Sequence, residues 1–236
     1  MRPYRYDLAV FDLDGTLLDT SRGILAALSD TLAEYGRVDV PDEDLTAFIG
    51  PPIEVALREL LGLRDEALDR AASRFRTRYR EKHLKKAAPY TGILPLLEML
   101  TALGIQKAVA TYKREGYARN LLCHFGFTER IPVIFGSDRA GLLQKSDLIR
   151  RCMAASGIND PTRTVMIGDT AEDARGAKEV GCDFIAVTYG FGFTTVEKAK
   201  ALGPVGIAEN PMDILPYVIG KERGKSCEYP IISPIF

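Results

Sequence analysis

Short apolar runs recur along this 236-residue chain, and each ends in polar or glycine residues. Such runs predict strands that are buried on both faces, because a strand with one wet face would alternate apolar and polar residues. The predicted strands are residues 7–11, 105–110, 132–135, 164–167 and 183–188. Helical segments over residues 114–125, 146–156 and 170–180 lie between most of them. This alternation predicts an α/β fold, a doubly wound parallel sheet with a Rossmann-like core, in which ligands bind beyond the carboxyl ends of the strands.

One connection is much longer than the others. About ninety residues separate the first two predicted strands, whereas a parallel crossover needs only about a dozen. The excess predicts helices over residues 22–35, 42–49, 53–61 and 65–84. We therefore expect an inserted α-helical cap domain that acts as a lid over the strand ends. The expected divisions are a catalytic core of residues 1–18 and 89–220, a cap of residues 19–88 with hinges near 18–20 and 88–91, and a tail of residues 221–236.

Composition narrows the class of protein. Apolar residues make up 46% and charged residues 27% of the chain, which predicts a globular protein and argues against disorder. A formal net charge of -1 gives no general reason to bind nucleic acid or an anionic membrane. No apolar run reaches membrane-spanning length, and the four cysteines have neither metal-ligand spacing nor disulfide-scaffold density. We expect a cytoplasmic protein with reduced thiols.

An arginine-rich stretch in the predicted cap, "RAASRFRTRYREKHLKK", offers an alternative to that expectation. Arginines with aromatic residues between them are found in nucleic-acid-binding segments. Helical spacing accounts for the pattern more simply, since an apolar stripe with period four leaves the arginines on solvated faces. That stripe consists of Leu68, Ala72, Phe75 and Tyr79. The same basic surface is a candidate for drawing anionic substrates toward the strand ends.

Two aspartates follow the first predicted strand in "AVFDLDGTLLDT". If the chain stays extended past Asp12, Asp14 points to the same side about 6.6 Å further on. Two such carboxylates raise each other's pKa unless a cation neutralises them, and Mg²⁺ takes one or two carboxylates while keeping room for phosphate oxygens. Gly15 permits the sharp turn that follows and exposes backbone N–H groups to an anion. The alternative is that both aspartates only form the turn.

Later strand ends supply matching groups. In "TVMIGDTAEDARGAK", Asp169 follows a predicted strand and Asp173 comes four residues later, so both are candidate metal ligands. Asp173 fits a capping box with Thr170 equally well. Thr111 ends another strand, where its hydroxyl is placed to donate to a phosphate oxygen or serves only as a strand former. Lys145 begins a predicted helix, where the helix dipole disfavours a cation unless it pairs with negative charge.

Four stretches, "FDLDGTLLDT", "VATYK", "QKSDLI" and "MIGDTAEDARGA", occur in this order and resemble the motifs of the haloacid dehalogenase superfamily of aspartyl-phosphate phosphatases. The resemblance covers about residues 5–215, and the inserted cap is similar to the phosphoglycolate phosphatase-like branch. The stretches "FIGPPI" and "YGFGF" resemble a bacterial group often described as 5'-nucleotidases or phosphoglycolate phosphatases. Apart from this resemblance, "YGFGF" is too short and misplaced for a dinucleotide fingerprint.

The resemblance implies a Mg²⁺-dependent phosphatase that acts on a small phosphorylated metabolite. Asp12 would be the nucleophile, and Asp14 would be the general acid and then the base for the attacking water. The implied metal ligands are Asp12, the backbone carbonyl of Asp14, Asp169 and Asp173. The implied substrate-binding residues are Gly15, Thr111, Tyr112 and Lys145. In the cap loop, Phe48 and Ile53 would shape specificity. The oligomer is expected to be a monomer or a homodimer.

Two positions depart from the family pattern. Tyr112 stands where a small polar residue is usual, so its phenol would narrow the substrate pocket or shift backbone donors. The spacing before Lys145 is less polar than in close relatives, which makes Lys113 the alternative cation. A phosphosugar mutase uses the same chemistry with a second hydroxyl as acceptor. A dehalogenase would not need Asp14, a phospho-acceptor signalling module is half this length and has no cap, and a silent binding protein would not have every catalytic position filled.

Overall fold

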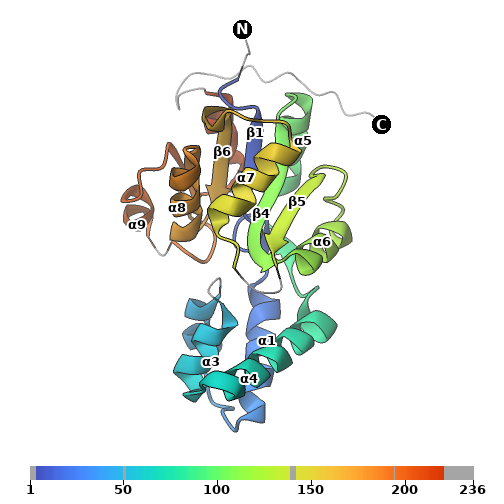
Figure 1. Ribbon diagram of the computed structural model, residues 1–236, viewed down its shortest axis with the longest axis vertical. Coiled ribbons are helices and arrows are strands. Elements are labelled where there is room, and N and C mark those ends of the chain that lie inside the picture. Colours follow the sequence, from blue (N-terminus) through green and yellow to red (C-terminus); the bar gives the residue numbers. More distant parts are fainter. Residues whose placement is uncertain (1–3, 50–51, 139–141, 194, 221–236) are drawn as a thin grey trace.

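The computed structural model describes residues 4–49, 52–138, 142–193 and 195–220 (Figure 1). Six strands form one parallel sheet in the order β5-β4-β1-β6-β7-β8. Their bounds are β1 (Leu8–Phe11), β4 (Gln106–Arg114), β5 (Val133–Ser137), β6 (Thr164–Gly168), β7 (Asp183–Val187) and β8 (Gly206–Ala208). The five predicted strands and the parallel fold are confirmed. The edge strand β8, only three residues long, was not predicted.

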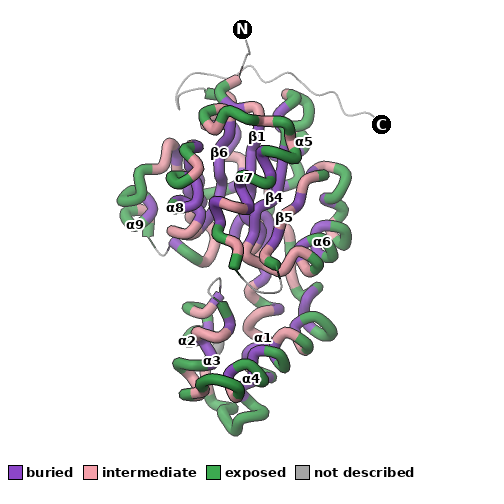
Figure 2. The backbone as a smooth tube through the Cα atoms, in the orientation of Figure 1, coloured by how far each residue is buried: buried purple, intermediate pink, exposed green. Residues whose placement is uncertain are grey.

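Both faces of the sheet are covered, which explains why its strands are continuous apolar runs. The core helices are α5 (Ile93–Ala102), α6 (Glu115–His124), α7 (Lys145–Ala155), α8 (Ala171–Val180), α9 (Val196–Lys200) and α10 (Ile214–Ile219), with short turns η3 (Pro161–Arg163) and η4 (Pro211–Asp213). In β1, Leu8 and Val10 pack in one hydrophobic cluster with α7 and α8. Ala9 and Phe11 pack in the other, with α5, α6 and α10. All four residues are buried, as the tube in Figure 2 shows for the central strands.

The long connection after β1 is helical. Its elements are α1 (Ser21–Glu34), α2 (Asp42–Leu45), η1 (Thr46–Phe48), α3 (Ile53–Leu61), α4 (Asp65–Arg78) and η2 (Tyr79–His83), which we call the cap. The helix predicted over residues 42–49 is instead α2 and a 3₁₀ turn, where the Thr46 hydroxyl donates to the Glu43 carbonyl oxygen at 2.6 Å. The helix predicted over residues 65–84 ends as a π-helical turn, η2. The region 20–87, as far as it is described, contains no strand.

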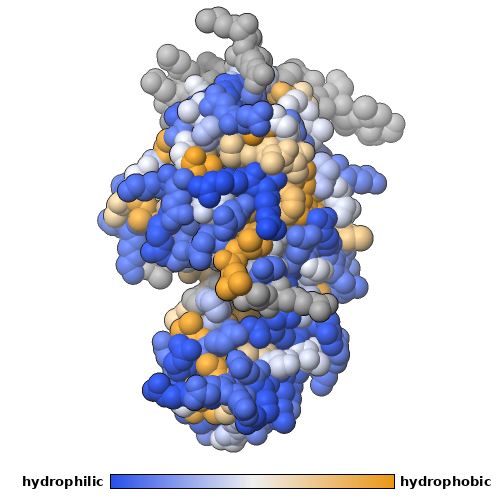
Figure 3. Space-filling view, in the orientation of Figure 1, coloured by the Kyte–Doolittle hydropathy of each residue, from blue (hydrophilic) through white to orange (hydrophobic). Residues whose placement is uncertain are grey.

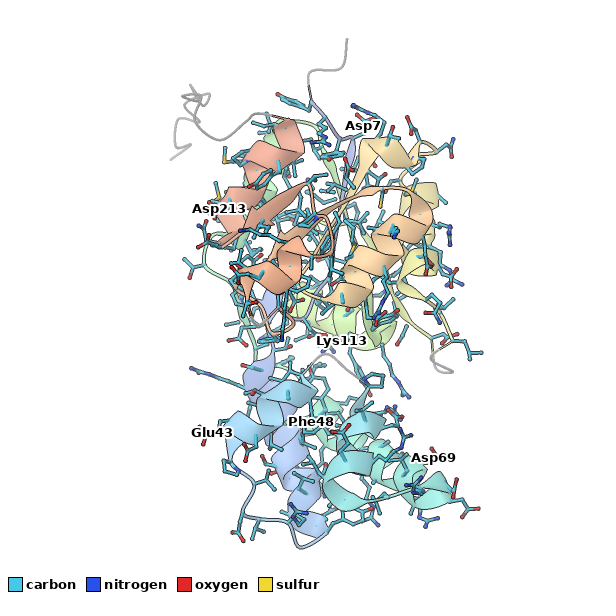
Figure 4. All side chains as sticks on the ribbon, turned by 90° about the vertical axis from the view of Figure 1, so that its left-hand side faces the viewer. Asp7, Glu43, Phe48, Asp69, Lys113 and Asp213 are labelled. Carbon is cyan, nitrogen blue, oxygen red and sulfur yellow. The ribbon has the colours of Figure 1, made fainter. Side chains whose placement is uncertain are left out.

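Two short strands join the cap to the sheet. The antiparallel strands β2 (Leu18–Asp19) and β3 (Ala88–Pro89) pair where the chain leaves the core and where it returns. Figure 1 shows the cap below one end of the sheet, and Figure 4 shows Lys113 at that end of the core with Asp7 at the opposite end. Since Asp7 precedes β1 and Lys113 lies near the end of β4, the carboxyl ends of these strands face the cap. The assignment of residues 19–88 as a separate domain stays a prediction.

The arginine-rich stretch forms α4 and η2. The predicted apolar stripe is buried, with Leu68, Ala72, Phe75 and Tyr79 at most 8% exposed. Several of its arginines pair with cap glutamates, namely Arg70 with Glu66, Arg74 and Arg78 with Glu34, Arg76 with Glu54, and Arg80 with Glu81. Figure 3 shows a mostly hydrophilic surface over this side of the cap. Among the described residues, no helix combines the length and apolarity needed to cross a membrane.

Candidate active site

The turn after β1 brings Asp12 and Asp14 to the end of the sheet that faces the cap. Asp12 continues the strand by one residue, and its N–H donates to the Ile167 carbonyl oxygen of β6 at 2.9 Å. The chain then folds back in a tight turn in which the Gly15 N–H donates to the Leu18 carbonyl oxygen at 2.9 Å. Gly15 has a φ of +83° in this turn, which a residue with a Cβ rarely adopts. The predicted turn at this glycine is therefore present.

Three carboxylates meet at this point. One oxygen each from Asp12, Asp169 and Asp173 lies within 4.8 Å of the other two, and all three residues are buried. Asp12 comes from the end of β1, Asp169 follows β6 directly, and Asp173 lies in the first turn of α8. Because β1 and β6 are neighbours in the parallel sheet, their carboxyl ends deliver these side chains to one place. The structure thus brings these three candidate metal ligands together.

A loop after β7 holds the Asp169 carboxylate. Its Oδ2 accepts hydrogen bonds from the N–H groups of Phe191 at 2.8 Å and Gly192 at 3.0 Å. The loop lies so close that a Cβ on Gly190 would be 2.3 Å from the Gly15 carbonyl oxygen and 2.5 Å from Asp169 Oδ2. This role of "YGFGF" was not predicted from the sequence. Its signal was the pair of glycines, which allow the backbone to approach the site.

Asp173 forms the capping box that the sequence predicts, and its other oxygen faces the carboxylate cluster. Its Oδ2 accepts from the Thr170 hydroxyl at 2.7 Å and from the Thr170 N–H at 3.0 Å, which completes a capping box. Its Oδ1 lies 2.7 Å from Lys145 Nζ, in an ion pair without hydrogen-bond alignment. One oxygen therefore fixes the side chain on α8 while the other faces the carboxylate cluster. This second oxygen, which pairs with Lys145, is the candidate metal-binding atom of Asp173.

Lys145 is the cation of the carboxylate cluster. It is the first residue of α7 and is 3% exposed. Its ammonium donates to Asp12 Oδ1 at 2.8 Å and to the Ala110 carbonyl oxygen at 3.1 Å, besides the ion pair with Asp173. The stem passes close to α8, where a Cβ on Gly176 would lie 2.7 Å from the lysine Cγ. The negative charge that a lysine at a helix start requires is thus supplied by two carboxylates.

Lys113, the alternative cation, pairs with Asp14 instead. Its Nζ donates to Asp14 Oδ1 at 2.8 Å and Oδ2 at 3.1 Å, and Asp14 Oδ1 also accepts from the Thr20 hydroxyl at 2.7 Å. The ammonium lies 4.8 Å from the ring centroid of Tyr79, which belongs to the cap. The Tyr79 hydroxyl is buried and has no hydrogen-bond partner among the described residues. Asp14 is therefore held by the core, by the hinge threonine and, through the lysine, by the cap.

Thr111 and Tyr112 lie at the end of β4. The Thr111 hydroxyl oxygen accepts from the Lys113 N–H at 3.2 Å, which leaves its own hydrogen available to a ligand. The Tyr112 hydroxyl oxygen accepts from the Lys145 N–H at 3.0 Å, and its ring centroid lies 4.9 Å from Lys145 Nζ. The phenol that departs from the family pattern is thus engaged with Lys145. Pocket narrowing by Tyr112 stays untested.

Burial and charge set the ionisation of the cluster. Burial raises the pKa of Asp12 to about 7, and although Lys145 lowers it, Asp173 and Asp169 add to the rise. Burial also raises the pKa of Asp169 to about 6, with a further contribution from Asp173 and an opposing one from its backbone donors. Burial disfavours the Lys145 ammonium, but Asp12 and Asp173 outweigh it, so the pKa of this lysine is raised above its usual value. The lysine is therefore charged, whereas burial disfavours the ionised form of the Asp12 and Asp169 carboxylates.

The cap residues proposed to shape specificity are not equally placed. Ile53 is a buried residue of the apolar core, and Phe48 is half-buried against it. Figure 4 shows Phe48 in the part of the cap that faces the core. The middle of the "FIGPPI" stretch, residues 50–51, and the tail, residues 221–236, lie outside the described residues. The role of this loop in specificity stays a prediction.

This geometry coincides with a family match. The model of the haloacid dehalogenase-like hydrolases matches residues 9–187, and this chain belongs to that family. The chain is 36% identical over 190 residues to a 5'-nucleotidase of Pseudomonas aeruginosa, with 80% of this chain and 85% of that protein covered. It is also similar to the crystal structure of a putative phosphatase from Clostridium difficile, with a TM-score of 0.83, 30% identity, and coverage of 91% and 99% of the two chains.

One relative has a different activity in its name. The chain is 37% identical over 187 residues to the tyrosine-protein kinase PtkA of Mycobacterium tuberculosis. The match covers 78% of this chain and 63% of that protein, so this chain spans less than two thirds of the length of PtkA. These matches establish the family of this chain.

Proposed function

We propose that this protein is a Mg²⁺-dependent phosphatase that hydrolyses a small phosphomonoester through an aspartyl phosphate on Asp12. The observation that carries the proposal is the buried cluster of Asp12, Asp169 and Asp173 with the Lys145 ammonium against it. Membership of the haloacid dehalogenase-like hydrolases supports hydrolysis as the reaction class. The substrate candidates are a nucleoside monophosphate, phosphoglycolate and a sugar phosphate, acted on in the cytoplasm by a monomer or homodimer.

The donor set fits Mg²⁺. Three buried carboxylates offer oxygen atoms within 4.8 Å of one another, and hard divalent ions prefer such ligands. The wider site has four carboxylates, those of Asp12, Asp14, Asp169 and Asp173, against two ammoniums, those of Lys113 and Lys145, so a doubly charged cation would balance the charge. We assign Asp12, Asp169, Asp173 and the backbone carbonyl of Asp14 as ligands. When bound, Mg²⁺ would neutralise charge and polarise a phosphoryl oxygen.

The proposed reaction has two halves. An Asp12 oxygen attacks phosphorus, a new O–P bond forms, and the bond to the substrate oxygen breaks. Asp14 donates a proton to this leaving oxygen. After the alcohol departs, the Asp14 carboxylate takes a proton from water, the water oxygen attacks phosphorus, and Asp12 is released as a carboxylate. Lys145, hydrogen-bonded to Asp12, favours the ionised form that the attack requires.

Donors around the turn would hold the transferred group. The Lys145 ammonium and the Thr111 hydroxyl are assigned to the phosphoryl oxygens. Backbone N–H groups of the turn after Asp12 are assigned to them as well, except that of Gly15, which donates to the Leu18 carbonyl oxygen. Such donors are worth most where negative charge grows in the transition state and water is excluded. Tyr112 borders the same pocket through its contacts with Lys145. The cap lies over these strand ends and would exclude water during the reaction.

A phosphate-release screen tests the proposal. Purified protein is assayed against a panel of phosphomonoesters and p-nitrophenyl phosphate, with Mg²⁺ or with EDTA. We expect release that depends on Mg²⁺, and a preferred metabolite within the panel. Hydrolysis that EDTA leaves undiminished would contradict the metal requirement.

Metal binding should depend on pH in a defined direction. Because the folded-state pKa values of Asp12 and Asp169 lie above the usual value of an aspartate, the metal-free folded protein binds more protons than the unfolded chain between about pH 4 and pH 7. These groups therefore lower the stability of the metal-free protein as pH rises through that window. Mg²⁺ competes with the protons, so we expect it to raise Tm more at about pH 8 than at about pH 5. An equal Tm shift at both pH values would contradict the assigned ligands.

Lys113→Met should impair the first half of the reaction. Without the Lys113 ammonium, the Asp14 carboxylate keeps only the Thr20 hydroxyl among its described side-chain partners. The carboxylate then loses its fixed orientation. We expect kcat for an alkyl phosphate to fall about tenfold, as part of the 10²–10⁴-fold that a general acid supplies. The loss for p-nitrophenyl phosphate should be smaller, because p-nitrophenolate leaves without a proton. Equal losses for both substrates would contradict an action through Asp14 as the general acid for the leaving group.

A second candidate differs only in the acceptor of the phosphoryl group. The 37% identity to PtkA favours transfer to a protein tyrosine, in which the tyrosine hydroxyl takes the place of water and Asp14 accepts its proton. A phosphosugar mutase would use a sugar hydroxyl in the same way. Product analysis with labelled ATP and a tyrosine-containing protein, and with glucose phosphates, separates these outcomes. Hydrolysis as the fastest reaction is the result that our proposal predicts.

A further inference from the structure

Tyr112 contacts Lys145 at both ends of the lysine. Its hydroxyl oxygen accepts from the Lys145 N–H at 3.0 Å, and its ring centroid lies 4.9 Å from Lys145 Nζ. We propose that Tyr112 is a positioning residue, which fixes the Lys145 ammonium at the phosphoryl site. Its hydroxyl holds the Lys145 backbone and its ring holds the Lys145 ammonium. This inference rests on the proposed function for its effect on catalysis. The contacts between Tyr112 and Lys145 do not depend on that function.

The ammonium needs partners that stay in place during a reaction. Of its contacts, the carboxylates of Asp12 and Asp173 belong to the proposed nucleophile and metal ligands, so their engagement changes as phosphate binds. The Ala110 carbonyl oxygen and the Tyr112 ring belong to β4 and take no part in the chemistry. A ring face attracts a cation through its quadrupole, and this attraction is strongest where both are desolvated. Lys145 is 3% exposed, which meets that condition.

The hydroxyl has a separate effect on the helix. The first N–H groups of a helix have no partner within the helix. In α7, the N–H of Lys145 is satisfied by the Tyr112 hydroxyl, while the preceding Gln144 N–H donates to the Asp147 carboxylate at 3.0 Å. The start of α7 is thereby tied to β4, the strand that also carries Ala110 and Thr111. This hydrogen bond fixes the position of the Lys145 backbone, from which the side chain extends to the carboxylate cluster.

A series of fluorinated rings at position 112 tests the charge contact. Tyr112→Phe removes the hydroxyl, and 4-fluoro-, 3,5-difluoro- and 3,4,5-trifluorophenylalanine then weaken the ring quadrupole with little change of shape. From phenylalanine to the trifluoro ring, we expect kcat to fall stepwise by about tenfold in total, with KM and Tm nearly constant. The same rings at Phe127, a buried residue outside the site, should leave kcat unchanged. A flat kcat across the position-112 series in an active enzyme overturns the positioning role.

A magnetic readout tests the geometry without any turnover. A ring placed over an ammonium shifts the neighbouring methylene resonance upfield, so the Lys145 Hε signal, assigned by its loss in Lys145→Met, should be shifted in the wild type and in Tyr112→Phe. In Tyr112→Leu the shift should disappear. An unshifted wild-type signal overturns the inference whether or not the protein is a phosphatase. An inactive wild type with a shifted signal would refute the proposed function alone.

Discussion

Asp12→Asn is expected to reduce kcat for phosphate release by about 10³-fold or more, since removal of a nucleophile costs at least this much in well-studied hydrolases. The amide has nearly the same size as the carboxylate but does not form an aspartyl phosphate. Lys145 keeps its contacts with Asp173 and the Ala110 carbonyl oxygen, so the variant should fold. Steady-state kinetics with Mg²⁺ and p-nitrophenyl phosphate measure the loss, and circular dichroism checks the fold.

Asp183→Asn is the matched control for this variant. Asp183 begins β7, at the end of the sheet away from the cap, where its carboxylate accepts from Arg5 and Tyr6. It has the same chemistry as Asp12 but lies at the amino end of a strand. We expect its kcat to stay within about twofold of the wild type. Activity of Asp12→Asn above a tenth of the wild-type value would exclude Asp12 as the nucleophile.

Lys145→Met should be the second most damaging change. It removes a donor for the phosphoryl oxygens, which we expect to reduce kcat by about 10²–10³-fold, as for the loss of one oxyanion-hole donor. It also leaves Asp12 and Asp173 without their common cation. Removing one partner of a buried ion pair costs about 3–5 kcal/mol, so the metal-free variant should lose stability to this extent. Mg²⁺ should restore more stability to the variant than it adds to the wild type.

Lys107→Met separates this effect from the loss of any buried lysine. Lys107 is 7% exposed, lies on β4 near its amino end, and donates to the Thr101 hydroxyl at 2.6 Å. Its replacement removes a buried ammonium that has no described carboxylate partner. We expect nearly full kcat and no gain in the stabilisation by Mg²⁺. If both lysine variants lost kcat equally, the assignment of Lys145 to the phosphoryl group would be wrong.

Much of this site could be predicted because the carboxyl ends of parallel strands lie at the same edge of the sheet, so residues that follow the strands are brought together. A strand buried on both faces is read from its apolar run, and its end is marked by the first polar residue. Asp12 and Asp169 each follow such a run directly, so their meeting required only that the two strands be neighbours in the sheet. The sequence could not decide between a capping role and a place in the cluster for Asp173, because one of its oxygens caps the helix and the other faces the cluster.

The contacts that were missed join segments with no local pattern to link them. Lys113 and Asp14 are 99 residues apart, and their pairing depends on where β4 places one side chain beyond its last buried residue. The Tyr79 ring over Lys113 depends on how the cap packs against the core, which the helical periodicity of α4 does not encode. Cap loops and the short strand β8 have too few residues for a periodic signal. Such elements are defined by tertiary packing instead.

Each site lysine is covered by a tyrosine ring, and the two lysines contact carboxylates with different proposed roles in the reaction. Lys145 lies under Tyr112 of the core and contacts Asp12, the proposed nucleophile. Lys113 lies under Tyr79 of the cap and contacts the proposed acid. A change in cap position would therefore disturb Asp14 before it disturbs Asp12. This difference is why the effect of Lys113→Met is expected to depend on the leaving group.

Chemical trapping of the intermediate tests the central claim most directly. In Asp14→Asn, p-nitrophenyl phosphate should still phosphorylate Asp12, because p-nitrophenolate leaves without a proton, whereas hydrolysis should stall for lack of a base. Borohydride reduces an acyl phosphate to the alcohol, so the quenched protein is digested and residue 12 is examined by mass spectrometry. We predict homoserine at position 12 only when substrate and Mg²⁺ were both present. Unmodified Asp12 after a burst of p-nitrophenolate, or the label on another residue, would contradict the account.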